Sequence, residues 1–282
     1  MSILKINTNN INDIRIREII NDLNLASAEI GIDYYVIGAK ARDFWFEANN
    51  ISQRRFTQDI DFAVLVSDLN QFQVFIKLLV DKFGFRVIEK LPYRVIYIKH
   101  EFTIDLLPFG GVNEAGYINF MDKFDTQISI LGFEEVYKEI SSYDYNKKEV
   151  KIASLPGLCI LKLVSWSDKP DSRIKDIEDI NIIIQNYFDI MEDEIFENHN
   201  DIFDNENFDR ILAGARVLGR NMIPILNHSD KLKTRILNVL NENIDIKGNC
   251  SMSKIMIRGT NNSIEEAIVL IKEVFRGIND KI

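Results

Sequence analysis

The chain has 282 residues, of which 46% are apolar and 27% charged, and its formal net charge is −9. This composition is typical of a soluble globular protein with one large or two modest domains, and the acidic total argues against a protein that coats nucleic acid through its overall field. No stretch approaches the roughly 18 consecutive apolar residues that a membrane span needs. The first ten residues lack the apolar core of an export signal, and the two cysteines lie far apart, so we expect a reduced, cytoplasmic protein.

The first half of the chain alternates between the helical and the strand period. Apolar residues at helical spacing predict helices over residues 11–30, 39–49 and 68–84. Runs rich in β-branched and aromatic residues predict strands over 33–38, 59–66, 85–90, 93–101 and 102–109. The last three strands follow one another with tight turns between them and therefore read as a sequential antiparallel set. The sequence thus predicts an α+β fold with a small mixed or antiparallel sheet that is flanked by helices.

From about residue 155 onward the pattern is almost entirely helical. A last strand after residue 148 leads to Pro156, which is tolerated in the first turn of a helix. Helical spacing predicts helices over 171–188, 208–226, 230–243 and 263–278. The acidic segment 189–207 is typical of a solvated loop or short helix, and 253–259 suggests a weak strand. The change of pattern predicts two domains, 1–154 and a mostly helical 155–282.

Two aspartates, Asp59 and Asp61, stand one residue apart at the start of the strand predicted over 59–66. Residues i and i+2 of a strand point to the same face, so the two carboxylates project side by side. Adjacent carboxylates repel unless a positive group lies between them, and a Mg²⁺ ion bound together with substrate phosphates would supply that charge. Aspartates at this spacing are also common in loops, and on an edge strand water would separate the charges.

A third aspartate, Asp105, lies among apolar residues of the strand predicted over 102–109. An unpaired charge is costly in such a place. Three carboxylates on adjacent strands suit a two-metal phosphoryl-transfer site, in which the third can also take the proton of the attacking hydroxyl. The alternative is a residue at a strand end that is hydrogen-bonded to a turn, and this strand alone favours neither interpretation.

Two further features suit a nucleotide. Gly38 ends a strand where a helix opens at once, which leaves backbone N–H groups for an anion such as a triphosphate. Lys162 lies in a strongly apolar helix and needs a counter-charge, and Asp176 and Asp179 follow one turn apart. A glycine at such a junction is often only a turn, and the two acids are equally typical of a solvated helix face.

Taken together, these motifs resemble the nucleotidyltransferase superfamily with the polymerase-β-like fold, and more narrowly the AbiEii/AbiGii toxins of bacterial abortive-infection systems. The resemblance rests on "GAKARDF" at 38–44, "RRFTQDIDF" at 54–62, "IDLLPF" at 104–109, "LK" at 161–162 and "RIKDIEDI" at 173–180. Arg55 and Thr57 match the arginine and threonine that precede the paired aspartates in the family. The likeness covers roughly residues 30–180.

The resemblance implies an α/β nucleotidyltransferase catalytic domain over 1–154, followed by a helical region. It implies transfer of a nucleoside monophosphate from an NTP, with Mg²⁺ or Mn²⁺, to a hydroxyl or phosphate acceptor. For a toxin-like enzyme it suggests RNA, such as tRNA, as the acceptor and an antitoxin as a partner.

The resemblance also gives roles to residues of this sequence. It implies that Asp59, Asp61 and Asp105 bind the metal ions and that Asp105 is also a possible base for the attacking hydroxyl. Triphosphate binding falls to Gly38, Ala39 and Lys162, with Arg42 and Asp43 supporting the loop from the first turn of the helix. Asp176 is a further acid of the site. The family usually has serine after the glycine, and the missing hydroxyl of Ala39 weakens phosphate binding by roughly 1.5–3 kcal/mol.

Two other functions fit the same motifs. One is nucleotidyl transfer to a small molecule such as an antibiotic, which an acidic surface favours slightly if the substrate is cationic. The other is a silent nucleotide- or partner-binding protein, against which the retention of three costly acids argues. An RNA acceptor calls for a basic stripe, although sets of this size also occur on solvated faces. Its candidates are Arg54, Arg55, Lys82, Arg86, Lys90, Arg94, Arg216, Arg220, Lys231, Lys233 and Arg235.

Overall fold

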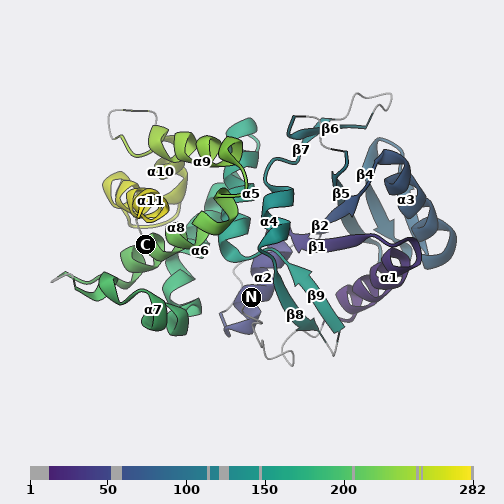
Figure 1. The fold of residues 1–282 in the computed structure, drawn as a ribbon, viewed down its shortest axis with the longest axis horizontal. Helices are drawn as coiled ribbons and strands as arrows, with labels where there is room; N and C mark the ends of the chain where they lie inside the picture. Colours follow the sequence, from purple (N-terminus) through teal and green to yellow (C-terminus); the bar gives the residue numbers. More distant parts are fainter. Residues whose placement is uncertain are drawn as a thin grey trace. The chain divides into compact units, whose positions relative to one another are not determined.

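The computed structural model describes residues 13–51, 59–112, 115–120, 127–145, 148–204, 207–245, 248 and 250–280. The chain divides into two compact units, Met1–Ser154 and Leu155–Ile282, and Figure 1 shows the elements of each. Among the helices of the described residues, none is long and apolar enough to cross a membrane.

The first unit is a sheet with helices. Its described residues form a seven-stranded sheet in the order β3-β4-β5-β2-β1-β9-β8, and a separate hairpin of β6 and β7. The sheet strands are β1 Asp33–Ile37, β2 Asp59–Val66, β3 Phe85–Ile88, β4 Leu91–Tyr97, β5 Phe102–Gly110, β8 Ser141–Tyr145 and β9 Lys148–Ile152. The hairpin strands are β6 Tyr117–Asn119 and β7 Gln127–Ser129. The helices are α1 Ile14–Ile30, α2 Gly38–Ala48, α3 Leu69–Phe83, the 3₁₀ turn η2 Ile98–His100 and α4 Phe133–Lys138.

Strand β2 lies at the middle of the sheet, between β1 and β5. It pairs antiparallel with β1 and parallel with β5, while β3, β4 and β5 form the expected antiparallel set. Ile60, Phe62 and Val64 of β2 are fully buried on one face, because alternate residues of a strand share a face and this one packs into the core. The α+β fold predicted from the sequence is confirmed.

The second unit contains helices throughout its described residues. These are α5 Leu155–Asp168, α6 Ile174–Ile190, α7 Glu192–Asn198, the 3₁₀ turn η3 Asn200–Phe203, α8 Arg210–Leu226, α9 Asp230–Glu242, α10 Ser251–Met256 and α11 Ile264–Asn279. Helices α8 and α11 pack at glycines: a Cβ on Gly219 would overlap the carbonyl oxygen of Val274, and one on Gly277 that of Arg216. The two backbones therefore approach one another more closely than larger side chains would allow.

The strand expected over 253–259 is wrong, because residues Ser251–Met256 form helix α10. Met252, Ile255 and Met256 are buried, at the i, i+3, i+4 spacing of a helix face, and the described residues of this unit offer no strand with which a lone strand could pair. The acidic segment 189–207 does contain a short helix, α7, as one of its two expected forms.

A buried guanidinium joins three elements of the second unit. Arg220 of α8, 5% exposed, donates two hydrogen bonds to Asp201 of η3, at 2.8 and 2.5 Å, and one to Asp280 after α11, at 2.6 Å. The hydrogen bonds from Arg220 lower the pKa of Asp201. Burial tends to raise the pKa of Asp280, but the hydrogen bonds from Arg216 and Arg220 outweigh it and the net shift is downward.

We expect Arg220→Met to lower the free energy of unfolding by about 2 kcal/mol at neutral pH, since it leaves the two carboxylates without this partner. A lowered carboxyl pKa contributes stability above its unfolded value and loses it as pH falls. The difference between the variant and the native chain should therefore shrink below about pH 4. Urea unfolding across pH measures it, with exposed Arg258→Met as the control; a difference that is the same at all pH values would contradict the assignment.

Candidate functional site

The two aspartates of β2 lie on one face, at the middle of the sheet. Asp59 and Asp61 are each half-buried, and they alternate with buried Ile60 and Phe62. The register places Asp61 directly opposite Asp105 of β5 on one side and Ile37 of β1 on the other. Residues directly opposite in a sheet point to the same face, so Asp59, Asp61 and Asp105 share a face, as the sequence predicts.

The carboxylate of Asp61 packs against the start of helix α2. Gly38 is the first residue of that helix and has φ +70°, a conformation that L side chains rarely adopt. A Cβ on Gly38 would overlap Oδ2 of Asp61 and lie 3.0 Å from its Cγ. Glycine is therefore required here for two reasons, the backbone angle and the close approach of the carboxylate.

The N-terminus of α2 has backbone amides of the kind that bind an anion. Ile37, the residue before it, makes no side-chain capping bond, and the first amides of a helix have no intrahelical acceptors. Helix N-termini bind phosphate through these amides and the helix dipole. Lys40 adds a cation in the first turn, with its ammonium 5.7 Å from the centroid of the Phe44 ring. A polyphosphate at this end would meet the half-buried Ala39 rather than a serine hydroxyl.

Asp105 is held by an arginine on the neighbouring strand. Arg94 of β4 lies directly opposite Asp105 and donates from Nε to Oδ1 at 2.6 Å and from an Nη to Oδ2 at 2.7 Å. The hydrogen bonds that Arg94 donates to Asp105 raise the pKa of Arg94, and the nearby charge of Asp59 adds to that effect. Arg94, Asp105 and Asp61 thus form a row across three strands in which a positive charge already compensates the carboxylates.

The donor set suits a divalent cation only in part. Carboxylate oxygens are ligands that Mg²⁺ prefers, and Asp59 and Asp61 offer them beside a phosphate-binding helix end. Among the described residues, however, no group of three or more His, Cys, Asp or Glu side chains is arranged to hold a metal ion. In the row of Arg94, Asp105 and Asp61, both oxygens of Asp105 already accept hydrogen bonds from Arg94. Asp59 and Asp61 offer carboxylate oxygens of the kind a cation prefers, whereas Asp105 would have to share its oxygens with Arg94.

Arg42 and Asp43 are inside the first unit rather than at its surface. Arg42 is 5% exposed and Asp43 fully buried, and an Nη of Arg42 lies 2.6 Å from Oδ1 of Asp43. Since α2 begins at Gly38, both residues lie in its second turn. The sequence analysis had placed them in the first turn. Both side chains are buried and therefore part of the packing between α2 and the rest of the first unit.

Lys162 has carboxylate partners within the second unit. Its ammonium donates to Asp179 at 2.7 Å and to Asp176 at 3.3 Å, and all three residues are buried. Arg173 in turn donates to the other oxygen of Asp176 at 2.7 Å. The counter-charge that an apolar helix requires for a lysine is thus supplied by α6. The structure brings Lys162 and Asp176 together and adds Asp179, to which the sequence gave no role.

We expect Lys162→Met to destabilise the chain by about 3 kcal/mol, because it removes the cation shared by two buried carboxylates. Lys175→Met provides the control, since Lys175 is exposed on the same helix as those carboxylates and should change stability by less than about 0.5 kcal/mol. Urea unfolding followed by circular dichroism measures both. Equal stabilities for the two variants would show that the ion cluster contributes nothing.

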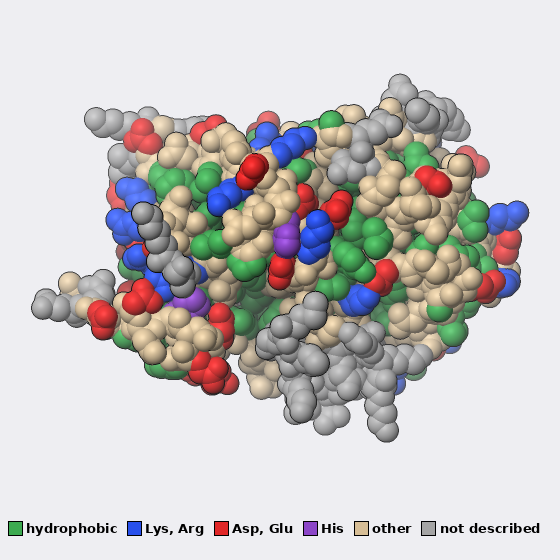
Figure 2. Space-filling view, viewed as in Figure 1, with side chains coloured by type: hydrophobic (Ala, Val, Ile, Leu, Met, Phe, Trp, Pro, Cys, Tyr) green, Lys and Arg blue, Asp and Glu red, His purple; other side chains and the backbone are tan. Residues whose placement is uncertain are grey.

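Most described candidates for a basic stripe pair with acids or polar groups of the chain. The ion pairs are Lys82–Glu29, Arg86–Glu101, Arg94–Asp105, Arg216–Asp280, Arg220–Asp201 and Arg235–Asp168. In the face that Figure 2 shows, blue and red side chains stand beside one another rather than in a continuous basic band. Arg54, Arg55 and Thr57 lie outside the described residues. The structure therefore gives the expected stripe little support within the part of the chain that it describes.

Arg94 is the residue of the carboxylate row that the sequence analysis missed, since it was assigned only to the basic stripe. A signal existed. The strands predicted over 93–101 and 102–109 were expected to pair antiparallel, and pairing about the turn at η2 places residue 94 opposite residue 105. A charged residue between Tyr93 and Val95 of an apolar strand needs a partner for the same reason that Asp105 does.

A family model described as the nucleotidyl transferase AbiEii toxin of a Type IV TA system matches residues 51–236. No curated protein matches the chain.

The solved structures with a similar chain trace have low sequence identity to this chain and low TM-scores. The antibiotic-resistance factor ANT(2'')-Ia is 12% identical with a TM-score of 0.38, over 67% of this chain and 96% of its own. A nucleotidyltransferase-like protein from Paracoccidioides brasiliensis is 14% identical with a TM-score of 0.36, over 70% and 92%. A CCA-adding enzyme solved with CTP is 13% identical with a TM-score of 0.29, over 93% and 69%. These scores are too low to carry an argument about substrate.

The family match takes in β2 with its two aspartates, β5 with Asp105 and the Lys162 cluster, and it spans more than half of the chain. The resemblance seen in the sequence is confirmed: this chain belongs to the AbiEii family of nucleotidyltransferase toxins.

Proposed function

We propose that the chain transfers a nucleoside monophosphate from an NTP, held with Mg²⁺ or Mn²⁺ at Asp59 and Asp61, to a hydroxyl or phosphate of an RNA acceptor such as tRNA. The observation that carries the proposal is the packing of the Asp61 carboxylate against Gly38. It joins a cation-binding group to a helix end that accepts phosphate. A family of toxins further suggests a cytoplasmic enzyme with an antitoxin partner.

The proposal gives a role to the start of α2 and to the three aspartates of the sheet. The amides at the start of α2 and the ammonium of Lys40 bind the triphosphate, and Asp59 and Asp61 offer oxygens to the cation. When bound, the cation neutralises charge on the phosphates and lowers the pKa of the attacking hydroxyl. Asp105 accepts the proton of that hydroxyl. A carboxylate oxygen has more than one lone pair, so Asp105 can keep its bonds to Arg94 while it does so.

Arg94 holds Asp105 in orientation, which the bidentate geometry favours. Lys162 and Asp176 keep the roles of phosphate contact and further acid that the family suggests.

A second candidate acceptor is a cationic small molecule. Two observations favour it: the net charge of −9, and the acidic partners of the arginines that an RNA acceptor would need. A phosphate backbone requires basic groups that are not already neutralised. A polyamine-bearing sugar would instead be attracted by the acidic total.

The test compares acceptors directly. The native chain is incubated with each α-labelled NTP and Mg²⁺, and with tRNA, total RNA or a cationic aminosugar. Label on tRNA, lost with a chelator and in Asp59→Asn, is expected. Label on the aminosugar alone would replace the RNA acceptor by the second candidate. If neither acceptor is labelled and Mg²⁺ with NTP does not raise Tm, the proposed transfer reaction is wrong.

A further inference from the structure

The second unit carries a stack of three phenylalanine rings. Phe203 of η3 lies between Phe196 of α7, with ring centroids 5.0 Å apart and planes at 3°, and Phe208, at 5.2 Å and 30°. Phe188 of α6 is buried and meets all three rings edge-on, at centroid distances of 5.9–6.4 Å. Phe188 therefore packs against every ring of the stack. We refer to Phe196, Phe203 and Phe208 as the ring stack.

The two outer rings are exposed to solvent. Phe196 is 50% exposed and Phe208 40%, and the nearby Ile211 of α8 is 37% exposed. Isolated exposed apolar residues are ordinary, but a fixed aromatic group next to a further apolar side chain is typical of a binding surface. Aromatic side chains are also the ones that dominate the centres of protein interfaces.

Exposed acidic side chains lie near the ring stack in sequence, and the arginines that line the adjoining pocket, Arg216 and Arg276, already pair with Asp280 and Glu273. Residues 176–209 contain no Lys or Arg, and Asp193, Glu197 and Asp204 are exposed next to the rings in sequence. One cation already uses this chemistry: the guanidinium of Arg210 lies 4.3 Å from the centroid of the Phe188 ring and 2.6 Å from Asp189. Rings flanked by carboxylates thus favour a cation through both the ring face and the ion pair.

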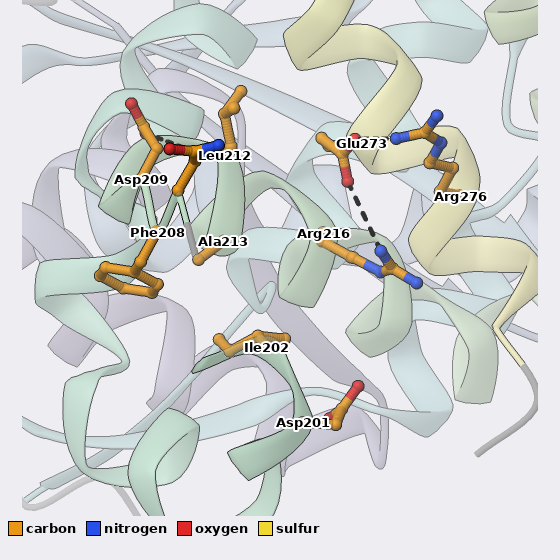
Figure 3. A pocket seen from close by; sticks show the side chains of 10 residues that line it. Asp201, Ile202, Phe208, Asp209, Leu212, Ala213, Arg216, Glu273 and Arg276 are labelled. Atoms are coloured by element: carbon orange, nitrogen blue, oxygen red, sulfur yellow. Dashed lines mark hydrogen bonds and ion pairs between the residues drawn. The ribbon is translucent and has the colours of Figure 1, made fainter. Parts of the chain in front are cut away.

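A small pocket opens beside the ring stack. Its volume is about 210 Å³, and Figure 3 shows Phe208 and Ile202 on one side and Arg216 and Glu273 on the other. This is below the range of about 300–1,000 Å³ that small-molecule sites occupy, so it suits one side chain. Asp209 lines it and caps α8 through Oδ1 alone; within the described residues, its Oδ2 accepts no hydrogen bond.

These features select one kind of occupant. A nucleic acid would bring phosphates against the carboxylates, which is unfavourable although the rings could stack on bases. A second copy of this surface would bring like charges together. We propose that the ring stack and its pocket form a docking surface for a basic segment of a partner protein, with an apolar side chain on the rings and an Arg or Lys directed to Asp209.

The test uses the full chain and three peptides of about 15 residues. The first alternates arginines with leucines or tryptophans at helical spacing, the second has Glu for each Arg, and the third has Ser for each apolar residue. Fluorescence anisotropy measures binding at two salt concentrations. We expect only the first peptide to bind, and to bind more weakly at high salt.

Variants of the exposed residues complete the test. Phe196→Ala with Phe208→Ala, and separately Asp193→Lys with Glu197→Lys and Asp204→Lys, should each lower affinity by about tenfold or more. The matched controls are Val74→Ala, and Asp81→Lys with Glu89→Lys and Glu265→Lys, all at exposed positions; they should bind as the native chain does. Equal binding of the acidic peptide, tighter binding of a single-stranded RNA, or self-association of the native chain that the Phe variants abolish would each overturn the proposal.

Discussion

The Asp61→Asn variant is expected to keep the native fold and to lose nucleotidyl transfer by about a thousandfold. Asparagine has nearly the shape of aspartate, so it can pack against Gly38 as the carboxylate does. It lacks the negative charge that a cation and its triphosphate require. The substitution also removes one negative charge from the sheet face that Asp61 shares with Asp105 and Arg94.

The control for this prediction is Asp81→Asn, at an exposed position of α3, which should leave the rate unchanged. Initial rates with α-labelled NTP measure both variants, and thermal unfolding shows that each is folded. A rate for Asp61→Asn within about threefold of the native rate would show that the reaction does not depend on this carboxylate.

Gly38→Ala is expected to destabilise the chain by about 2–5 kcal/mol and to impair NTP binding. The first part of the loss comes from an L residue at φ +70°, about 1–2 kcal/mol, and the rest from the overlap of its Cβ with Oδ2 of Asp61. Asp61 would have to turn away from the helix end, and the cation and phosphate sites would separate.

The chain offers a control that isolates the two causes. Gly31, after α1, has φ +68° and nothing within 4 Å of an added Cβ, so Gly31→Ala carries the backbone strain without the overlap. The further loss in Gly38→Ala should fall when Asp61 is also replaced by Ala, which a double-mutant cycle of unfolding free energies measures. A cycle with no coupling would mean that the carboxylate and the helix start do not interact.

Periodicity was enough to predict the α+β class, because β2 and β5 alternate or run apolar over their length and the helices have a clear 3.6-residue pattern. The shared face of Asp59 and Asp61 follows from the two-residue repeat of a strand alone. The closeness of Asp61 to Gly38 does not, since it depends on the pairing of β1 with β2, and such pairing between distant segments leaves no local mark in the sequence.

Errors arose where a tertiary contact decides the outcome. Ser251–Met256 has β-branched and long apolar residues that suit either period, and burial of Met252 and Ile255 within a helical unit selected the helix. Arg94 looked like one more surface cation because its partner lies eleven positions away on the next strand. The carboxylate partners of Lys162 were easier to predict, since a lysine in a strongly apolar helix needs a counter-charge.

The central claim is that the chain transfers a nucleoside monophosphate and that this transfer needs the β2 carboxylate that packs against the start of α2, Asp61. The most direct measurement compares α-labelled with γ-labelled NTP, for the native chain and Asp61→Asn, with the RNA acceptor and Mg²⁺. The account predicts that α label joins the acceptor, that γ label leaves as pyrophosphate, and that the variant does neither. Transfer of γ label to the acceptor, or undiminished transfer of α label by the variant, would contradict it.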